Sequence, residues 1–189
     1  MSEETEHSGG WGALSELPGN PIMWVLIISE LLVFGALLVG FAVVRLLHPD
    51  MVLTGQSQLS IPLGGLNTLI LVTSGWLAAR AVRARVGGDR RGARLHLVGA
   101  GALGLGFLAV KAVEFADKAS RGLGLETDTF WTLFFLTTGF HAAHVVMGLI
   151  VLAIVGRHDS VENLETGAAF WHMVDLIWLI LFPLVYLLR

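Results

Sequence analysis

Five long apolar stretches, separated by shorter polar segments, organise this chain. They predict membrane-spanning helices over residues 21–47, 66–86, 95–119, 128–155 and 166–188. Each stretch is long enough to cross a hydrocarbon core of about 30 Å at a rise of about 1.5 Å per residue. Helices are expected because lipid offers no partners for backbone N–H and C=O groups, and because the sequence lacks the short alternating segments of a β-barrel. The pattern therefore predicts an all-α, polytopic membrane protein.

The polar segments set the expected domain organisation. Residues 1–20 are polar and contain glycine, and we expect this segment to be mobile, as chain ends often are. Residues 21–189 are expected to form a single transmembrane domain of five helices. The connection over residues 48–63 is polar enough to be predicted as a loop in water.

Arginines are concentrated in the connection between the second and third predicted spans. They are Arg80, Arg83, Arg85, Arg90, Arg91 and Arg94. Short cytoplasmic connections of membrane proteins are enriched in Lys and Arg, so this connection is predicted to be cytoplasmic. The N-terminus is then predicted to be cytoplasmic as well, and the C-terminus at Arg189 to lie outside.

The same arginines allow a second interpretation. Arg80, Arg83 and Arg85 could contact lipid headgroups, since a cytoplasmic arginine near the membrane attracts anionic lipid by about 1 kcal/mol. The alternative is that the arginines act only as a topology signal. No aromatic residues are interleaved with this charge, so the sequence does not favour a nucleic-acid partner.

Composition agrees with a membrane location and limits the possible chemistry. Hydrophobic residues make up 54% of the 189 residues and charged residues 14%, whereas about 25% is usual for soluble domains. The chain contains no cysteine. It therefore cannot form disulfides, iron–sulfur clusters, covalently attached haem c or a thiolate copper centre.

Ionisable residues inside the predicted spans are the main candidates for function. They are Glu30, His141, His144, His172 and Asp175. A charged group at mid-span costs about 2.5–3.5 kcal/mol on insertion scales, so a physical reason is needed for each of them. Counting residues from the predicted cytoplasmic ends places Glu30, His144 and Asp175 at depths of roughly 13–17 Å. Three helices are therefore expected to place acids and histidines in one intramembrane polar layer.

The predicted layer has more than one interpretation. It could be a proton-linked or partner-facing network, or its groups could simply hold the helices together through hydrogen bonds. His141 and His144 are three residues apart and share a helix face. A metal site there would still need about two further ligands, which His172, Asp175 or Glu30 could supply. The sequence alone assigns no catalytic, redox or transport step to the layer.

A second charged group lies near the predicted outer end of the third span. Lys111, Glu114 and Lys118 follow one another at spacings of three and four residues, which places them on one helix face. We expect an ion pair between Lys111 and Glu114, with the side chains partly reaching toward the membrane surface.

Several sequence motifs together resemble a known family. Residues 134–152 read FFLTTGFHAAHVVMGLIVL and residues 170–188 read FWHMVDLIWLILFPLVYLL. In order and spacing they are similar to the last two helices of subunit III of haem–copper oxidases, with its T-G-x-H-x-x-H-V-x-x-G and W-H-x-x-D-x-x-W runs. Upstream, ISELLVFGALL (28–38), LNTLILVTSG (66–75) and VKAVEF (110–115) also fall where the family has counterparts.

This resemblance implies an accessory subunit with no haem or copper of its own. The catalytic subunit I, with subunit II beside it, would carry these cofactors in a bacterial plasma membrane, in aerobic respiratory electron transport from cytochrome c or quinol. The chain would stabilise the catalytic subunit, hold structural phospholipid and support proton uptake. Glu30 falls at the position of the family's membrane-embedded glutamate. The long form of the family has seven spans, so lipid sites made by its first two helices are not carried over.

Two alternatives to an oxidase subunit remain open from the sequence. The five-helix length and the C-terminal run look most like the relatives of subunit III that are associated with nitric oxide reductase. An independent ion-coupled transporter is the second alternative. The sequence shows no inverted repeat and no pair of Gly- or Pro-broken helices, which transporters often have.

Overall fold

A computed structural model describes residues 21–157 and 160–188, and the predicted mobile segment 1–20 lies outside them. The described elements are α1 (Pro21–Leu47), α2 (Pro49–Ser57), α3 (Ile61–Val86), α4 (Arg90–Ser120), α5 (Thr129–Arg157), α6 (Val161–Phe182) and a short π-helix, η2 (Pro183–Leu187). Five helices are long and apolar enough to cross a membrane, which confirms the predicted all-α fold with five spans.

Three spanning helices begin earlier than the apolar pattern predicts, at residues 61, 90 and 161 rather than 66, 95 and 166. Side-chain caps extend two of them into polar sequence. The Asp89 carboxylate accepts a hydrogen bond from the Gly92 N–H at 2.8 Å, and the Ser160 hydroxyl accepts one from the Asn163 N–H at 3.1 Å. Such caps satisfy N–H groups that have no partner in the first helical turn.

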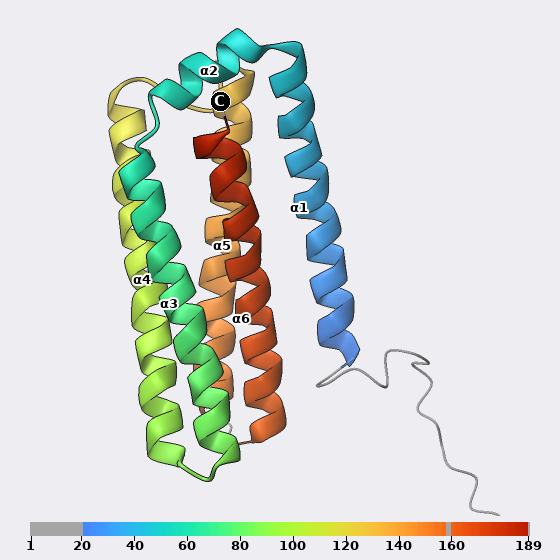
Figure 1. Cartoon of the computed structure of the whole chain (residues 1–189), viewed down its shortest axis with the longest axis vertical. Coiled ribbons are helices and arrows are strands. Elements are labelled where there is room, and N and C mark those ends of the chain that lie inside the picture. Colours follow the sequence, from blue (N-terminus) through green and yellow to red (C-terminus); the bar gives the residue numbers. More distant parts are fainter. Residues whose placement is uncertain (1–20, 158–159, 189) are drawn as a thin grey trace, which may run out of the picture.

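The connection between the first two spans is not the predicted loop. It contains the nine-residue helix α2, which begins at Pro49, where a missing N–H costs a helix nothing. Figure 1 shows α2 crossing the end of the bundle that also carries the C-terminus. Val52 and Gln56 on this helix are buried, so α2 closes that end of the bundle and does not project into water.

Pro183 changes the course of the last helix. Proline has no N–H and disrupts regular α-helical bonding, and the chain continues from it as the π-helix η2, in which the Leu188 N–H donates to the Pro183 carbonyl at 2.9 Å. Two side chains from earlier elements bind this end. The Gln56 amide donates to the Val185 carbonyl at 3.0 Å, and the Arg45 guanidinium donates to the Leu188 carbonyl at 2.5 Å.

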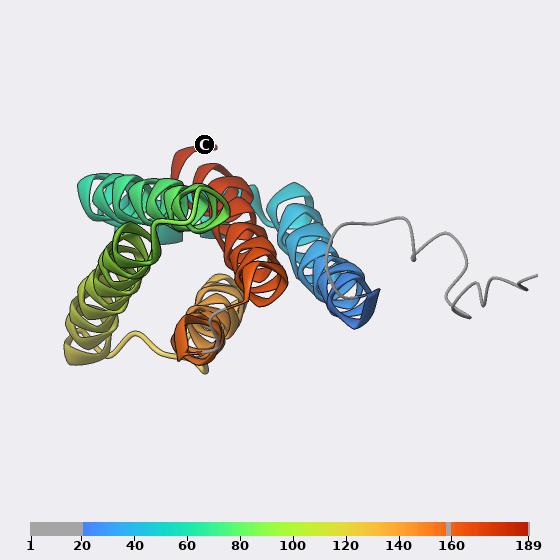
Figure 2. The ribbon, with the colours of Figure 1, turned by 90° about the horizontal axis from the view of Figure 1, so that it is seen from below.

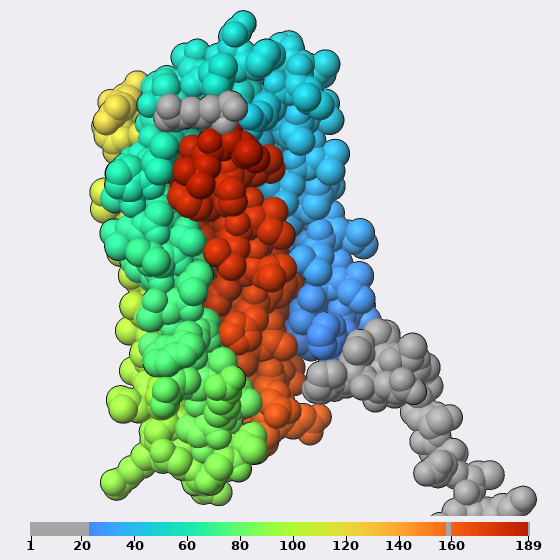
Figure 3. Space-filling model, in the orientation of Figure 1, coloured from blue at the N-terminus to red at the C-terminus, as the bar shows by residue number. Residues whose placement is uncertain are grey.

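Helix α6 lies at the centre of the arrangement and contacts α1, α3 and α5 (Figures 1 and 2). On the face shown in Figure 3, α6 is flanked by α3 on one side and α1 on the other. Its Trp171 ring lies between Gly104 of α4 and Gly148 of α5, where a Cβ atom would come within 2.6 and 2.7 Å of the ring. The Trp171 indole N–H donates to the Ser74 hydroxyl of α3 at 3.0 Å. One side chain therefore joins four helices.

Candidate functional site

The structure pairs Glu30 of α1 with His144 of α5. The His144 Nε2 atom lies 2.9 Å from Oε2 of Glu30, and the two side chains are 5% (His144) and 18% (Glu30) exposed. The other ring nitrogen, Nδ1, lies 2.8 Å from the Phe140 carbonyl oxygen. A carbonyl oxygen only accepts hydrogen bonds, so Nδ1 carries a hydrogen and donates it. The pair thus links the peripheral helix α1 to α5, which bears His141 and His144.

The two contacts of the His144 ring restrict how it can face the Glu30 carboxylate. With Nδ1 protonated, an unprotonated Nε2 would direct its lone pair at a negative carboxylate, which is repulsive. The contact at 2.9 Å between Nε2 and Oε2 is an ion pair when the His144 ring is charged, and Oε2 has no hydrogen-bond partner among the described residues.

His172 and Asp175 lie elsewhere on the bundle. The His172 Nδ1 atom is 3.8 Å from Oδ2 of Asp175, and the His172 side chain is 46% exposed. The Asp175 carboxylate packs against Gly75 of α3, where any Cβ atom would collide with its Oδ2. Within the described residues, no hydrogen bond or ion pair connects these two residues with Glu30 or His144. The described residues of the predicted layer thus form two separate pairs.

His141 belongs to neither pair. Its side chain is fully buried, and its ring contacts Phe107 at a centroid distance of 5.5 Å and Trp178 at 5.2 Å. Phe34 of α1 contacts the rings of both His141 and His144. Across residues 21–157 and 160–188 no three His, Asp or Glu side chains converge in the way a metal site requires. His141 and His144 lie on the same helix, but their rings do not converge on a common polar partner.

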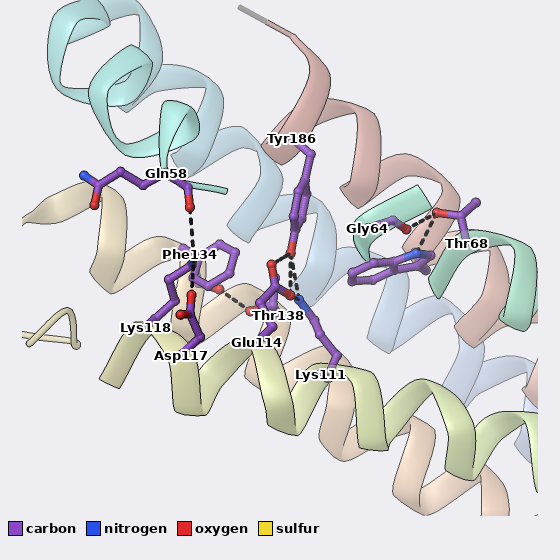
Figure 4. Close-up of polar contacts among 11 residues, drawn as sticks. Gln58, Gly64, Thr68, Lys111, Glu114, Asp117, Lys118, Phe134, Thr138 and Tyr186 are labelled. Atoms are coloured by element: carbon purple, nitrogen blue, oxygen red, sulfur yellow. Dashed lines mark hydrogen bonds and ion pairs between the residues drawn. The ribbon is translucent and has the colours of Figure 1, made fainter. Parts of the chain in front are cut away.

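Lys111 and Glu114 form a buried ion pair, so the expected reach toward the membrane surface is wrong. The Lys111 Nζ atom lies 2.7 Å from Oε2 of Glu114, and each side chain is only 2% exposed. Tyr186 of η2 completes the cluster. Its hydroxyl accepts from Lys111 Nζ at 2.8 Å and donates to the Glu114 carboxylate at 2.9 Å, as Figure 4 shows.

Aromatic rings enclose this lysine–glutamate–tyrosine cluster. The Lys111 ammonium lies 5.0 Å from the Trp178 ring and 5.2 Å from the Phe134 ring, within the range of a cation–π interaction. A charge taken out of water is tolerated when it is paired and hydrogen-bonded. Every charged atom of this cluster has such a partner, which indicates a structural role.

Lys118, the third member of the predicted series, binds the chain near α2. Its ammonium donates to the Gln58 carbonyl at 2.8 Å and to the Asp117 carboxylate at 2.9 Å (Figure 4). Like Lys111 it is buried. The connection after α2 is thereby held against the end of α4.

The arginines predicted as lipid contacts gather at the end of the bundle opposite α2. Arg80 and Arg83 lie near the end of α3, where Arg80 is exposed and Arg85 is half buried. The Arg80 guanidinium lies 5.0 Å from the Trp76 ring, itself largely exposed. An aromatic ring beside an exposed arginine is typical of a membrane–water interface.

Sequence reasoning missed Tyr186 and Gln56. Tyr186 is the single tyrosine of the chain and follows an apolar run. A tyrosine hydroxyl buried in such a run needs a hydrogen-bond partner, and this need is a sequence signal that could have identified the residue. Gln56 lies in the segment predicted as a loop in water, and no residue pattern there indicates that its amide binds the C-terminal turn.

Comparison with known proteins identifies relatives along nearly the whole chain. The family model described as Cytochrome c oxidase subunit III matches residues 19–189. Cytochrome c oxidase subunit 3 of Thermostichus vulcanus is 35% identical over 175 residues, covering 87% of this chain and 84% of that protein. The subunit 3 of Synechocystis sp. is 30% identical over 173 residues, covering 87% and 73%.

A further relative from Aeropyrum pernix is named Heme-copper oxidase subunit I+III. It is 30% identical over 184 residues, which cover 87% of this chain and 22% of that longer protein. In that relative the matching region is one part of a larger chain whose name includes subunit I.

Proposed function

Since the chain belongs to the cytochrome c oxidase subunit III family, and is thus an accessory subunit of a haem–copper oxidase, we propose that it stabilises the catalytic subunit and supports proton uptake. The single observation that supports the proton role is the Glu30–His144 contact, which places a carboxylate oxygen 2.9 Å from a ring nitrogen inside the bundle. The Glu30 side chain on the peripheral helix α1 is 18% exposed, while its Oε2 atom is buried against His144. A group of this kind can take up a proton and pass it on without altering the packing around it.

The bond chemistry would take place on partner subunits. We expect haems and copper on the catalytic subunit I, with subunit II in the same complex and no catalytic or cofactor-binding residue on this chain. The Aeropyrum pernix relative, which joins subunits I and III in its name, supports subunit I as a direct neighbour. The electrons for such a complex come from cytochrome c or quinol.

The membrane setting is also part of the proposal. We expect a bacterial plasma membrane, with the α3–α4 connection in the cytoplasm and the C-terminus outside, because six arginines lie at that end. Structural phospholipid would bind there, with Arg80, Arg83 and Arg85 as headgroup contacts. The exposed Trp76 ring beside Arg80 supports this location for the membrane surface.

The three named relatives are oxidase subunits, and no observation favours a nitric-oxide-reductase accessory protein or an independent ion-coupled transporter.

The test is purification in mild detergent through a tag on the N-terminus, with an optical spectrum and peptide mass analysis. We expect haem bands and a histidine-rich partner of many spans. The same preparation then serves for oxygen consumption with Glu30→Gln, which should slow turnover severalfold at high pH, where protons are scarce, at unchanged haem content. Glu126→Gln, an exposed carboxylate outside the spans, is the control.

Two results would contradict parts of the proposal. A colourless protein that purifies alone would argue against an oxidase subunit. If Glu30→Gln lowers the haem content or the yield of complex in proportion to the loss of turnover, Glu30 acts in stability and not in proton uptake.

A further inference from the structure

A groove runs along the outer surface between α4 and α5, starting at the arginine-rich end of the bundle. Its volume is about 430 Å³. Leucine, valine, alanine and glycine line most of its length: Leu97, Val98, Gly101, Leu105, Leu149, Leu152, Ala153 and Gly156. Its outer end is formed by Arg94 and Arg157, both exposed. In Figure 2, α4 and α5 diverge from one another.

The groove has the length of one membrane leaflet. On α4 it extends from Arg94 to Leu105, which at about 1.5 Å per residue is about 16 Å. Half of a hydrocarbon core of about 30 Å is close to that value. The groove therefore runs from the membrane surface to about the middle of the bilayer, as an extended acyl chain does.

Glycine and tryptophan shape the groove. A Cβ atom on Gly101 would meet only Leu149, at an ordinary contact distance of 3.9 Å. One helical turn further, the Trp171 ring fills the space beside Gly104 and Gly148. The space between α4 and α5 is thus open at the level of Gly101 and filled at the level where the groove ends.

The charge at the outer end distinguishes this groove from a second hollow between the same helices. The second hollow, of about 560 Å³, lies toward the other end of the bundle and is lined by residues such as Leu123, Phe135 and Gly139, without a charged side chain. The first groove is apolar along its length and ends at Arg94 and Arg157, and no acidic residue lies among its lining residues in the described chain. This is the pattern expected for a ligand with an apolar tail and an anionic head.

We propose that the α4–α5 groove binds one acyl chain of an anionic phospholipid, with the headgroup phosphate held by Arg94 and Arg157. Arginine suits this role because its planar guanidinium donates two parallel hydrogen bonds to phosphate oxygens. The site rests on the membrane location and on the groove, and does not depend on which redox partner the chain has. It is distinct from the surface contacts expected for Arg80, Arg83 and Arg85, which do not line the groove.

The experiment uses a phosphatidylglycerol with a photoreactive group near the end of one acyl chain, added to the purified detergent-solubilised complex. After illumination, the crosslinked peptides of this chain are mapped and quantified by mass spectrometry. We expect crosslinks on the α4 and α5 segments that line the groove. Arg94→Gln or Arg157→Gln should each lower the yield about fivefold, the effect of removing one cation beside an anionic headgroup.

Matched variants separate the groove from its surroundings. Gly101→Leu should fill the groove and lower the crosslink yield severalfold, whereas Gly106→Leu on the same helix, where nothing lies within 4 Å, should leave it unchanged. Arg91→Gln is the control for charge, since Arg91 is exposed at the same end but does not line the groove.

Three results would overturn the proposal. The first is an unchanged yield with Gly101→Leu, and the second is an equal yield from a phosphatidylcholine probe together with no effect of either arginine substitution. The third is crosslinking to a partner subunit in place of α4 and α5, which would make the groove a protein contact. The arginine variants alter exposed side chains, so they remain informative if Gly101→Leu does not fold. All these readouts are independent of oxygen consumption, so a failure here leaves the oxidase assignment untouched.

Discussion

Two charged sites inside the same bundle differ in how completely their charged groups are enclosed and paired. The lysine–glutamate–tyrosine cluster of Lys111, Glu114 and Tyr186 is enclosed by rings, and each of its charged atoms has a partner. The pair of Glu30 and His144 joins the peripheral helix α1 to α5, and the Glu30 side chain keeps partial exposure. The burial of a charged side chain is therefore not by itself evidence that the residue has a functional role. The enclosed cluster indicates a structural role, whereas the proposed role of the Glu30–His144 pair is in proton uptake.

The largest effect should come from removing one charge of the enclosed cluster. Glu114→Gln leaves the Lys111 ammonium buried without its counter-charge, and breaking a buried pair in this way costs about 3–5 kcal/mol. The measurement is the unfolding midpoint of the purified complex in a denaturing detergent titration. The double variant Lys111→Met with Glu114→Gln should recover most of the loss, because no unpaired charge then remains. Equal losses in the single and double variants would contradict a structural ion pair.

Removing one hydroxyl from the cluster tests it more finely. Tyr186→Phe keeps the ring and its packing but leaves Lys111 and Glu114 each short of one hydrogen bond, so we expect a loss of about 1–3 kcal/mol. The same titration measures it. Phe182→Leu, one turn earlier on α6, changes an aromatic ring without touching the cluster's hydrogen bonds. A Tyr186→Phe variant as stable as the parent would show that the hydroxyl is not needed.

The open pair should contribute less to stability. Hydrogen bonds between helices in membranes are worth about 0.6 kcal/mol on average, with a maximum near about 1.7 kcal/mol, so Glu30→Gln should cost no more than that. Its effect should instead appear in the infrared spectrum. A carboxyl or carboxylate band of the parent should be lost in Glu30→Gln and kept in Glu114→Gln. If Glu30→Gln destabilises the complex as much as Glu114→Gln does, the contrast between the two sites is wrong.

The smallest effect is expected at His172. Its ring nitrogen is 3.8 Å from the Asp175 carboxylate, and the side chain is nearly half exposed. A separation of 3.8 Å is too long for a hydrogen bond, so His172→Gln should shift the unfolding midpoint by less than any variant above. Turnover and haem content should stay at parental levels. A loss of turnover here would instead point to a contact with a partner subunit at this face.

The five spans are predictable from sequence because a long apolar run in a chain of this composition is stable chiefly as a helix in lipid. Helix α2 is not predictable in that way, since its nine residues carry no such run and only packing against the bundle end buries Val52 and Gln56. The apolar pattern does not predict that helices begin at Arg90 and Val161, because side-chain caps and not hydrophobicity determine these two positions.

For the site, counting residues along a span gives the depth of a side chain in the membrane. It does not give the side of the helix on which that side chain lies. It places Glu30, His144 and Asp175 at similar depths, yet Asp175 faces Gly75 of α3 and lies apart from the other two. The burial of Lys111 depends on Tyr186, which lies 75 residues away along the chain. No local pattern carries that information.

The two hydrogen bonds that hold the turn at η2 have a consequence for biosynthesis. The carbonyl of Val185 is bound by Gln56, and that of Leu188 by Arg45, so early elements of the bundle hold residues that are synthesised much later. During translation α1 and α2 can enter the membrane early, but these hydrogen bonds form only after η2 has left the ribosome. The nascent bundle remains open at this end until then, and a neighbouring subunit that packs against α1 can do so before the bundle locks.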